Sequence, residues 1–170
     1  GDEVDVVVGT LGKALGSYGA YVCASAETID FLVNSARPFI FSTAPPPSSV
    51  AAAAAALELV SPHRVERLQA NASRFRAALA ATGLDAGPSQ TQIVPIEVGG
   101  AETAMELCER VLERGVFAQG IRPPTVPEGS SRLRFTVMAS HRAGELERAA
   151  KLVGGAAREL GLLAPQSIAA

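Results

Sequence analysis

The residues best suited to chemistry lie in the glycine-rich stretch 9–19, where Thr10 precedes Lys13 by three positions. The chain has two lysines and thirteen arginines, so a residue needed for charge alone would usually be arginine here. Lysine can lose its proton and attack a carbonyl, whereas arginine in a protein effectively cannot. The arrangement fits a Schiff-base lysine beside a phosphate-binding hydroxyl. A surface lysine in a flexible turn is the alternative.

Two familiar phosphate-binding loops do not match this stretch. A Walker loop would place its first glycine at Val7 and its metal-binding hydroxyl at Ala14, so that pattern fails twice. The dinucleotide fingerprint G-x-G-x-x-G is also absent, because the glycines stand at positions 9, 12, 16 and 19. A non-catalytic phosphate- or nucleotide-binding module that uses the glycine-rich turn stays open as an alternative of a different class.

Four sequence blocks resemble, in the same order, those of the α-oxoamine synthases, which are pyridoxal-phosphate enzymes of fold type I. The first is Thr-x-Gly-Lys-x-x-Gly with the Gly-Ala-Tyr-Val that follows it, and the others span residues 41–46, 121–127 and 132–136. The Ile-Arg-Pro-Pro-Thr-Val-Pro block at 121–127 is most similar to the members that condense L-alanine with a pimeloyl thioester in biotin biosynthesis. The resemblance therefore implies a pyridoxal 5'-phosphate-dependent acyltransferase.

The resemblance also implies cofactor contacts. Lys13 would carry pyridoxal phosphate and remove the α-proton of the amino acid, and Thr10 would hold the cofactor phosphate. Ser42 and Thr43 would reach the phosphate of the neighbouring subunit in a homodimer with shared active sites. For these two residues the alternative is a helix cap, because Ser-Thr before prolines commonly begins a helix.

Arginines and a threonine are the expected substrate-binding residues. The guanidinium fork of Arg122 or Arg134 could bind a carboxylate through two parallel hydrogen bonds. Arg132 would share a strand face with Arg134, so periodicity alone does not choose between them, and the resemblance favours Arg134. Thr125 resembles a substrate-contacting threonine, although a threonine between prolines could simply shape its loop.

The reaction and the extent of the chain leave several points open. A 2-amino-3-ketobutyrate CoA ligase, a 5-aminolevulinate synthase or a serine palmitoyltransferase would share the lysine and the Arg-Leu-Arg strand. The acyl donor could be attached to coenzyme A or to a carrier protein. Other cofactor-binding residues of the family would precede residue 1, so we expect a C-terminal fragment that is inactive alone.

Composition indicates an ordinary soluble protein. The net charge is −2 and 48% of residues are hydrophobic, with no basic run and no apolar span that favours a nucleic-acid or membrane partner. Cys23 and Cys108 lie far apart, which favours a reducing, cytoplasmic location. His63 and His141 have no acidic or cysteine partner at ligand spacing, so no metal site is expected.

The element pattern predicts an α/β fold. The expected division has residues 1–47 as the end of a large cofactor-binding domain, 48–88 as connecting helices and 89–170 as a small C-terminal α/β domain. We expect a buried valine-rich strand at 4–8, an extended piece at 39–41 and a buried alanine-rich helix that includes 51–56. The order after residue 89 should be strand, helix, strand, strand, helix, and Glu147 should pair with Lys151 on the last helix.

Overall fold

The computed structural model describes residues 4–163 and has the expected mixed α/β character. It divides into two compact units, Gly1–Ser61 and Pro62–Ala170, each of which has its own internal contacts. Residues 62–88 therefore pack with the second unit. The functional division into a large-domain end, connecting helices and a small domain stays a prediction.

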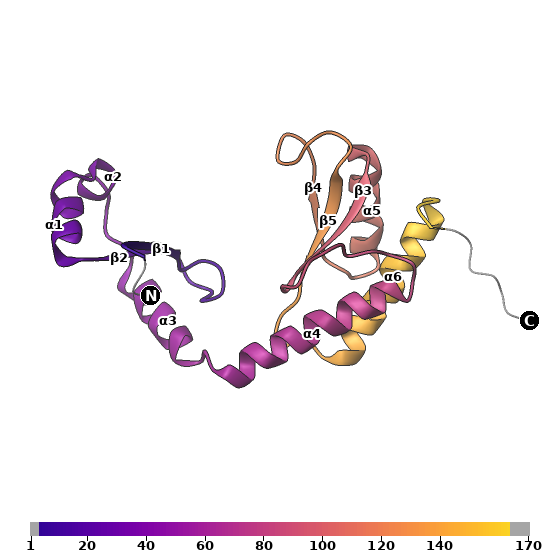
Figure 1. Ribbon diagram of the computed structural model, residues 1–170, viewed down its shortest axis with the longest axis horizontal. Coiled ribbons are helices and arrows are strands. Elements are labelled where there is room, and N and C mark those ends of the chain that lie inside the picture. The colour runs from indigo at the N-terminus through magenta and orange to yellow at the C-terminus, as the bar shows by residue number, and fades with distance from the viewer. Residues whose placement is uncertain (1–3, 164–170) are drawn as a thin grey trace, which may run out of the picture. The chain divides into compact units, whose positions relative to one another are not determined.

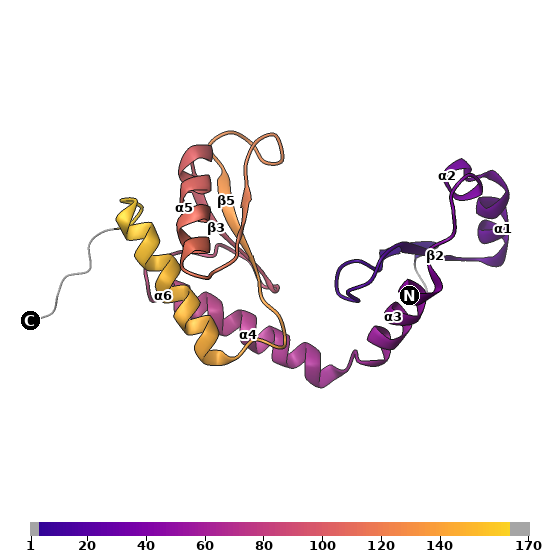
Figure 2. The same cartoon turned by 180° about the vertical axis from the view of Figure 1, so that it is seen from behind.

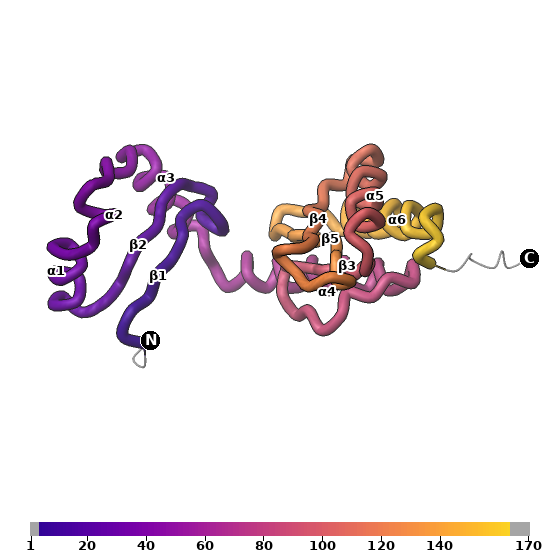
Figure 3. Tube along the Cα trace, turned by 90° about the horizontal axis from the view of Figure 1, so that it is seen from above, coloured from indigo at the N-terminus to yellow at the C-terminus, as the bar shows by residue number. Residues whose placement is uncertain are grey.

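The first unit is built on an antiparallel pair of strands, β1 (Val6–Thr10) and β2 (Ala20–Ala24). Three helices follow along the chain, α1 (Ala26–Ser35), α2 (Arg37–Ile40) and α3 (Pro47–Glu58). The connection between β1 and β2 contains the glycine-rich turn, which Figures 1 and 3 show in indigo. Helix α1 is capped by Ser25, whose side chain accepts a hydrogen bond from the backbone N–H of Thr28.

Three sequence expectations for this unit were wrong. The valines of β1 are exposed, Val8 by 69%, because among the described residues no helix or strand other than β2 packs against β1. The alanine-rich segment forms α3 as predicted, but Ala53 is its one buried residue. Residues 37–40 form the short helix α2 where an extended piece was expected. Pro38 lies in the first turn of that helix, where a missing N–H costs nothing.

The second unit has the predicted order of elements. After α4 (Pro62–Ala80) come β3 (Ile93–Gly99), α5 (Ala101–Glu113), β4 (Gln119–Ile121), β5 (Ser131–Thr136) and α6 (Ala143–Glu159). The three strands form an antiparallel sheet in the order β3-β5-β4, so β5 is central. Strand β4 is the shortest of the three.

One face of this sheet makes the core of the unit. Helix α5 contacts all three strands, and α4 lies along α6 in both views (Figures 1 and 2). Leu133 and Phe135 of β5 point into this core, where the Phe135 ring meets the ring of Phe75 edge-on with centroids 5.4 Å apart. Side chains alternate along a strand, so Arg132, Arg134 and Thr136 lie on the opposite, open face of the sheet.

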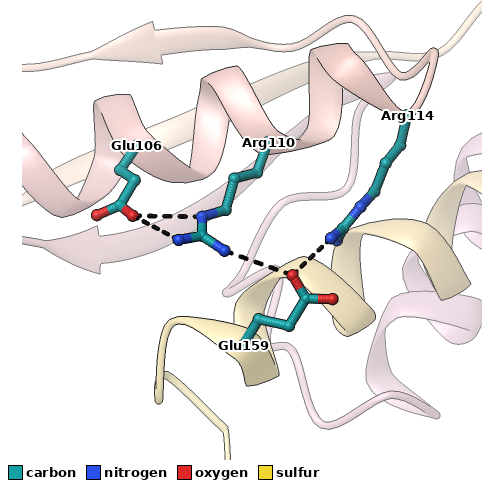
Figure 4. A network of polar contacts seen from close by, with 4 residues as sticks. All are labelled: Glu106, Arg110, Arg114 and Glu159. Atoms are coloured by element: carbon teal, nitrogen blue, oxygen red, sulfur yellow. Dashed lines mark hydrogen bonds and ion pairs between the residues drawn. The ribbon is translucent and has the colours of Figure 1, made fainter.

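A polar network joins α5 to α6 (Figure 4). Arg110 contacts Glu106 at 2.7 Å within α5 and Glu159 of α6 at 3.4 Å, and Arg114 also binds Glu159. The hydrogen bond from Arg114, together with the charges of both arginines, lowers the pKa of the Glu159 carboxyl. The hydrogen bond with Glu106 is the main reason that the pKa of Arg110 is raised.

The expected pair of Glu147 with Lys151 does not form. Glu147 instead binds Arg74 of α4 at 3.1 Å, because α4 and α6 lie side by side and bring the two side chains together. This contact between helices was hidden from the sequence, where residues 74 and 147 are far apart.

Candidate active site

The lysine turn brings its two expected cofactor residues into direct contact. The Nζ of Lys13 donates a hydrogen bond to the Oγ1 of Thr10 over 3.0 Å, and both side chains are exposed. Strand β1 ends at Thr10, and the turn is closed by a backbone hydrogen bond from the Leu11 N–H to the Gly19 carbonyl. An amine and a hydroxyl therefore face the same space at the end of a strand.

Further contacts fix the shape of the turn. The backbone N–H of Ser17 donates a hydrogen bond to the carbonyl of Leu11. The Ser17 hydroxyl donates a second hydrogen bond to the carbonyl of Ser49 in α3 over 2.6 Å. Gly16 and Gly19 have φ angles of +59° and +107°, a region in which residues with a Cβ are strained. The sequence indicated the glycines, but the contact between Ser17 and Ser49 could not be read from it.

The donor set of this turn fits an aldehyde cofactor that carries a phosphate group. Lys13 supplies the amine that an aldehyde requires, and Thr10 supplies a hydroxyl. The backbone N–H groups of Gly12, Lys13 and Ala14 have no acceptor in residues 4–163. Unpaired N–H groups in a turn are suited to bind an anion such as phosphate.

Ser42 and Thr43 lie between α2 and α3 and are exposed. Helix α3 begins after Pro46, which occupies the N-cap position, so neither residue caps it. Within the described part of the chain, their hydroxyls make no hydrogen bond. The helix-cap alternative is therefore wrong, and both hydroxyls are available for another partner.

The structure distinguishes the two arginines that periodicity left equivalent. Arg132 binds the Glu97 carboxylate at 3.1 Å and donates to the carbonyl of Ser130, so its guanidinium is engaged. The Arg134 side chain is exposed and has no hydrogen bond or ion pair within residues 4–163. Arg134 is thus the arginine of this strand that is available to a ligand.

Arg122 and Thr125 lie in the loop between β4 and β5. Their backbones form a turn, in which the Thr125 N–H binds the Arg122 carbonyl over 3.1 Å. Both side chains are exposed and have no hydrogen-bond partner among the described residues. Lys13, Thr10, Ser42 and Thr43 thus belong to the first unit, and the substrate-binding candidates Arg122, Thr125 and Arg134 belong to the second.

A histidine and a cysteine that could take part in chemistry make local hydrogen bonds instead. The Nδ1 of His141 accepts a hydrogen bond from the Met138 N–H just before α6, and the Cys108 thiol lies 3.2 Å from the Ala118 carbonyl. In residues 4–163, no group of three or more His, Cys, Asp or Glu side chains could hold a metal ion. In the same residues, no helix has both the length and the apolar character to span a membrane.

Most of the chain is similar in sequence to known proteins. The chain is 53% identical to the 8-amino-7-oxononanoate synthase of Citrifermentans bemidjiense over 95% of its own length and 43% of that relative. The corresponding protein of Geobacter metallireducens is also 53% identical, over 95% of this chain and 42% of the relative. The chain therefore spans less than half the length of the curated relatives it matches.

Solved structures show the same arrangement of elements. The serine palmitoyltransferase of Sphingomonas wittichii superposes with a TM-score of 0.88 at 28% identity, over 96% of this chain and 42% of that chain. The 8-amino-7-oxononanoate synthase of Francisella tularensis has a TM-score of 0.75 at 26% identity, over 91% and 46%. A lysine-to-alanine variant of a serine palmitoyltransferase from S. paucimobilis, solved with a bound PLP-myriocin aldimine, has a TM-score of 0.86 at 28% identity, over 95% of this chain and 42% of that chain.

The family model for aminotransferases of class I and II matches residues 1–153. This match includes the lysine turn, the loop at 121–127 and the Arg-Leu-Arg strand. The chain belongs to the aminotransferase class I and II family.

Proposed function

We propose that the full-length protein condenses L-alanine with a pimeloyl thioester to give 8-amino-7-oxononanoate, CO2 and a free thiol, in biotin biosynthesis. The observation that carries this proposal is the contact between Lys13 and Thr10 in a turn with unpaired N–H groups. Relatives at 53% identity that bear the name of this synthase support the choice of substrates. Pyridoxal 5'-phosphate is the proposed cofactor, since a similar solved structure contains it.

The lysine turn would do most of the chemical work. When bound, pyridoxal phosphate supplies the electron sink that stabilises negative charge at the α-carbon of the amino acid. The Nζ of Lys13 holds the cofactor in the resting enzyme and moves the proton at that carbon. The Thr10 hydroxyl and the turn N–H groups bind phosphate oxygens, which fixes the orientation of the ring.

The second unit would supply the carboxylate-binding groups. Arg134 has a free guanidinium on the open face of the sheet, where it can bind the amino-acid carboxylate through two parallel hydrogen bonds. Arg122 and Thr125 present exposed polar groups from one loop, and we assign them to substrate binding as well.

We also infer a homodimer and a cytoplasmic location. Ser42 and Thr43 have unengaged hydroxyls, which supports their assignment to the cofactor phosphate of the neighbouring subunit. Cys23 and Cys108 are free thiols, as is usual in a reducing compartment.

The test is a substrate panel with the purified full-length protein. L-Alanine with pimeloyl-CoA or pimeloyl-carrier protein should yield 8-amino-7-oxononanoate, and comparison of the two donors identifies the natural thioester. Exclusive use of glycine or serine would contradict the proposal and would favour a ligase, a 5-aminolevulinate synthase or a serine palmitoyltransferase instead.

A spectroscopic test separates an enzyme from a non-catalytic phosphate-binding module. The full-length protein with pyridoxal phosphate should show an absorbance band above about 400 nm. Lys13→Ala should lose this band, and Lys151→Ala, which removes the one other lysine of the chain, should keep it. Loss of the band in both variants, or in neither, would contradict the assignment of Lys13.

A further inference from the structure

The open face of the second unit's sheet places different neighbours beside its two arginines. In the strand register, Arg132 stands between Glu97 of β3 and Ile121 of β4. Arg134 stands between Pro95 of β3 and Gln119 of β4. Directly opposed residues on one face of antiparallel strands have Cβ atoms about 4.5–5.5 Å apart, so these neighbours are within reach of each arginine.

The pair of Arg132 with Glu97 shows what an acidic neighbour does on this face. The carboxylate binds the guanidinium at 3.1 Å and offsets its charge. Arg134 has no acidic neighbour in register, because proline offers no side-chain polar group and glutamine is neutral. The positive charge of Arg134 is therefore left for a ligand.

The side chain of Gln119 has a hydrogen-bond acceptor and few contacts of its own, so it can orient the guanidinium of Arg134. Its side chain is exposed, and its one hydrogen bond in the described residues is a long contact of 3.4 Å from Nε2 to the Gly120 carbonyl. The amide oxygen can accept a hydrogen bond from one N–H of a guanidinium without cancelling its charge. The remaining N–H groups of the fork could then bind a carboxylate.

We propose that Gln119 is a positioning residue for Arg134: with the substrate bound, its amide oxygen would accept one guanidinium N–H and so direct the others toward the carboxylate of the amino acid. This inference rests on the proposed function of Arg134, and it adds the residue that orients the guanidinium without forming an ion pair with it. A neutral amide at position 119 is the essential feature, since an acid there would reproduce the pair of Arg132 with Glu97.

The experiment compares Gln119→Glu, Gln119→Leu and Glu97→Gln in the full-length holoenzyme. Gln119→Glu should raise KM for L-alanine about tenfold with little change in kcat, because the new carboxylate pairs with Arg134 and competes with the substrate. Gln119→Leu, which keeps the approximate size but removes the acceptor, should raise this KM about threefold. Glu97→Gln, which breaks the pair with Arg132, should leave KM unchanged.

Direct binding separates this inference from the proposed function. The Kd of L-alanine can be measured by calorimetry on the holoenzyme without thioester. It should rise most in Gln119→Glu, less in Gln119→Leu and not at all in Glu97→Gln. A wild-type protein that binds alanine but makes no 8-amino-7-oxononanoate would contradict the proposed reaction, while the order of Kd values would still decide the role of Gln119. Unchanged KM and Kd in both Gln119 variants, or an equal change in Glu97→Gln, would overturn the inference. If Gln119→Glu does not fold, Gln119→Leu decides.

Discussion

The Nζ of Lys13 and the Oγ1 of Thr10 are hydrogen-bonded over 3.0 Å, although both side chains are exposed. The hydroxyl lies at the end of β1 and the amine lies three residues further on, inside a turn closed by backbone hydrogen bonds. The fold of the turn thus places the amine and the hydroxyl side by side. This preorganisation suits a cofactor that needs a covalent anchor and an anion-binding group at the same place.

Removal of the Thr10 hydroxyl should weaken cofactor binding. We expect Thr10→Val to raise the Kd for pyridoxal phosphate in the full-length protein about tenfold, because a hydrogen bond to a charged phosphate is lost. Thr10→Ser keeps the hydroxyl and should bind nearly as tightly as the wild type. Absorbance titration with the cofactor measures both constants. Equal weakening in the two variants, or weakening in Thr10→Ser alone, would contradict a specific role for the hydroxyl.

Replacement by lysine should affect KM for L-alanine differently at the two arginines of β5. Arg134→Lys keeps the charge but loses the fork, and we expect KM for L-alanine to rise about tenfold or more. Arg132→Lys can still pair with Glu97 at the same position, so its KM should stay within about twofold of the wild type. Steady-state kinetics of the two full-length variants checks this difference. A larger effect at Arg132 would reverse the assignment.

Two adjacent glycines of α6 should have opposite effects on stability. A Cβ at Gly154 would lie 2.5 Å from the Cβ of Thr82, so Gly154→Ala should lower the free energy of unfolding by about 1–3 kcal/mol. A Cβ at Gly155 would meet nothing within 4 Å. Because alanine is the better helix former, Gly155→Ala should raise stability by up to about 1 kcal/mol. Urea denaturation of the full-length protein measures both, and equal effects would contradict close packing at Gly154.

The link from Glu159 to Arg114 and Arg110 should make stability depend on pH. The arginines hold the pKa of Glu159 below its ordinary value of 4.5, so the folded state favours the charged carboxylate. This contribution is fully present above the ordinary value and disappears as the pH falls through the lowered one. Glu159→Gln should therefore be less stable than the wild type near pH 7, with a difference that vanishes in acid.

Urea denaturation at about pH 7 and about pH 3 follows this difference, and added salt should reduce it at the higher pH. Glu113→Gln is the matched control, because Glu113 lies at the end of α5 and takes no part in the network. A difference between wild type and Glu159→Gln that is independent of pH would contradict the role of the ion pairs.

Features that depend on neighbours in the chain could be predicted from the sequence. The glycine turn that contains Lys13, the cap at Ser25 and the order of elements after residue 89 all follow from nearby residue types and their spacing. Each of them involves short-range backbone geometry, in which a few residues restrict the possible conformations.

Features that depend on distant segments could not be predicted in this way. A strand period of two puts Arg132 and Arg134 on one face, and only the register with β3 and β4 gives one an acidic neighbour and the other a neutral one. Likewise, Glu147 pairs with Arg74 because two helices far apart in the chain lie together. Local patterns specify which face a side chain occupies, but its partner across that face depends on where the folded chain places the next element.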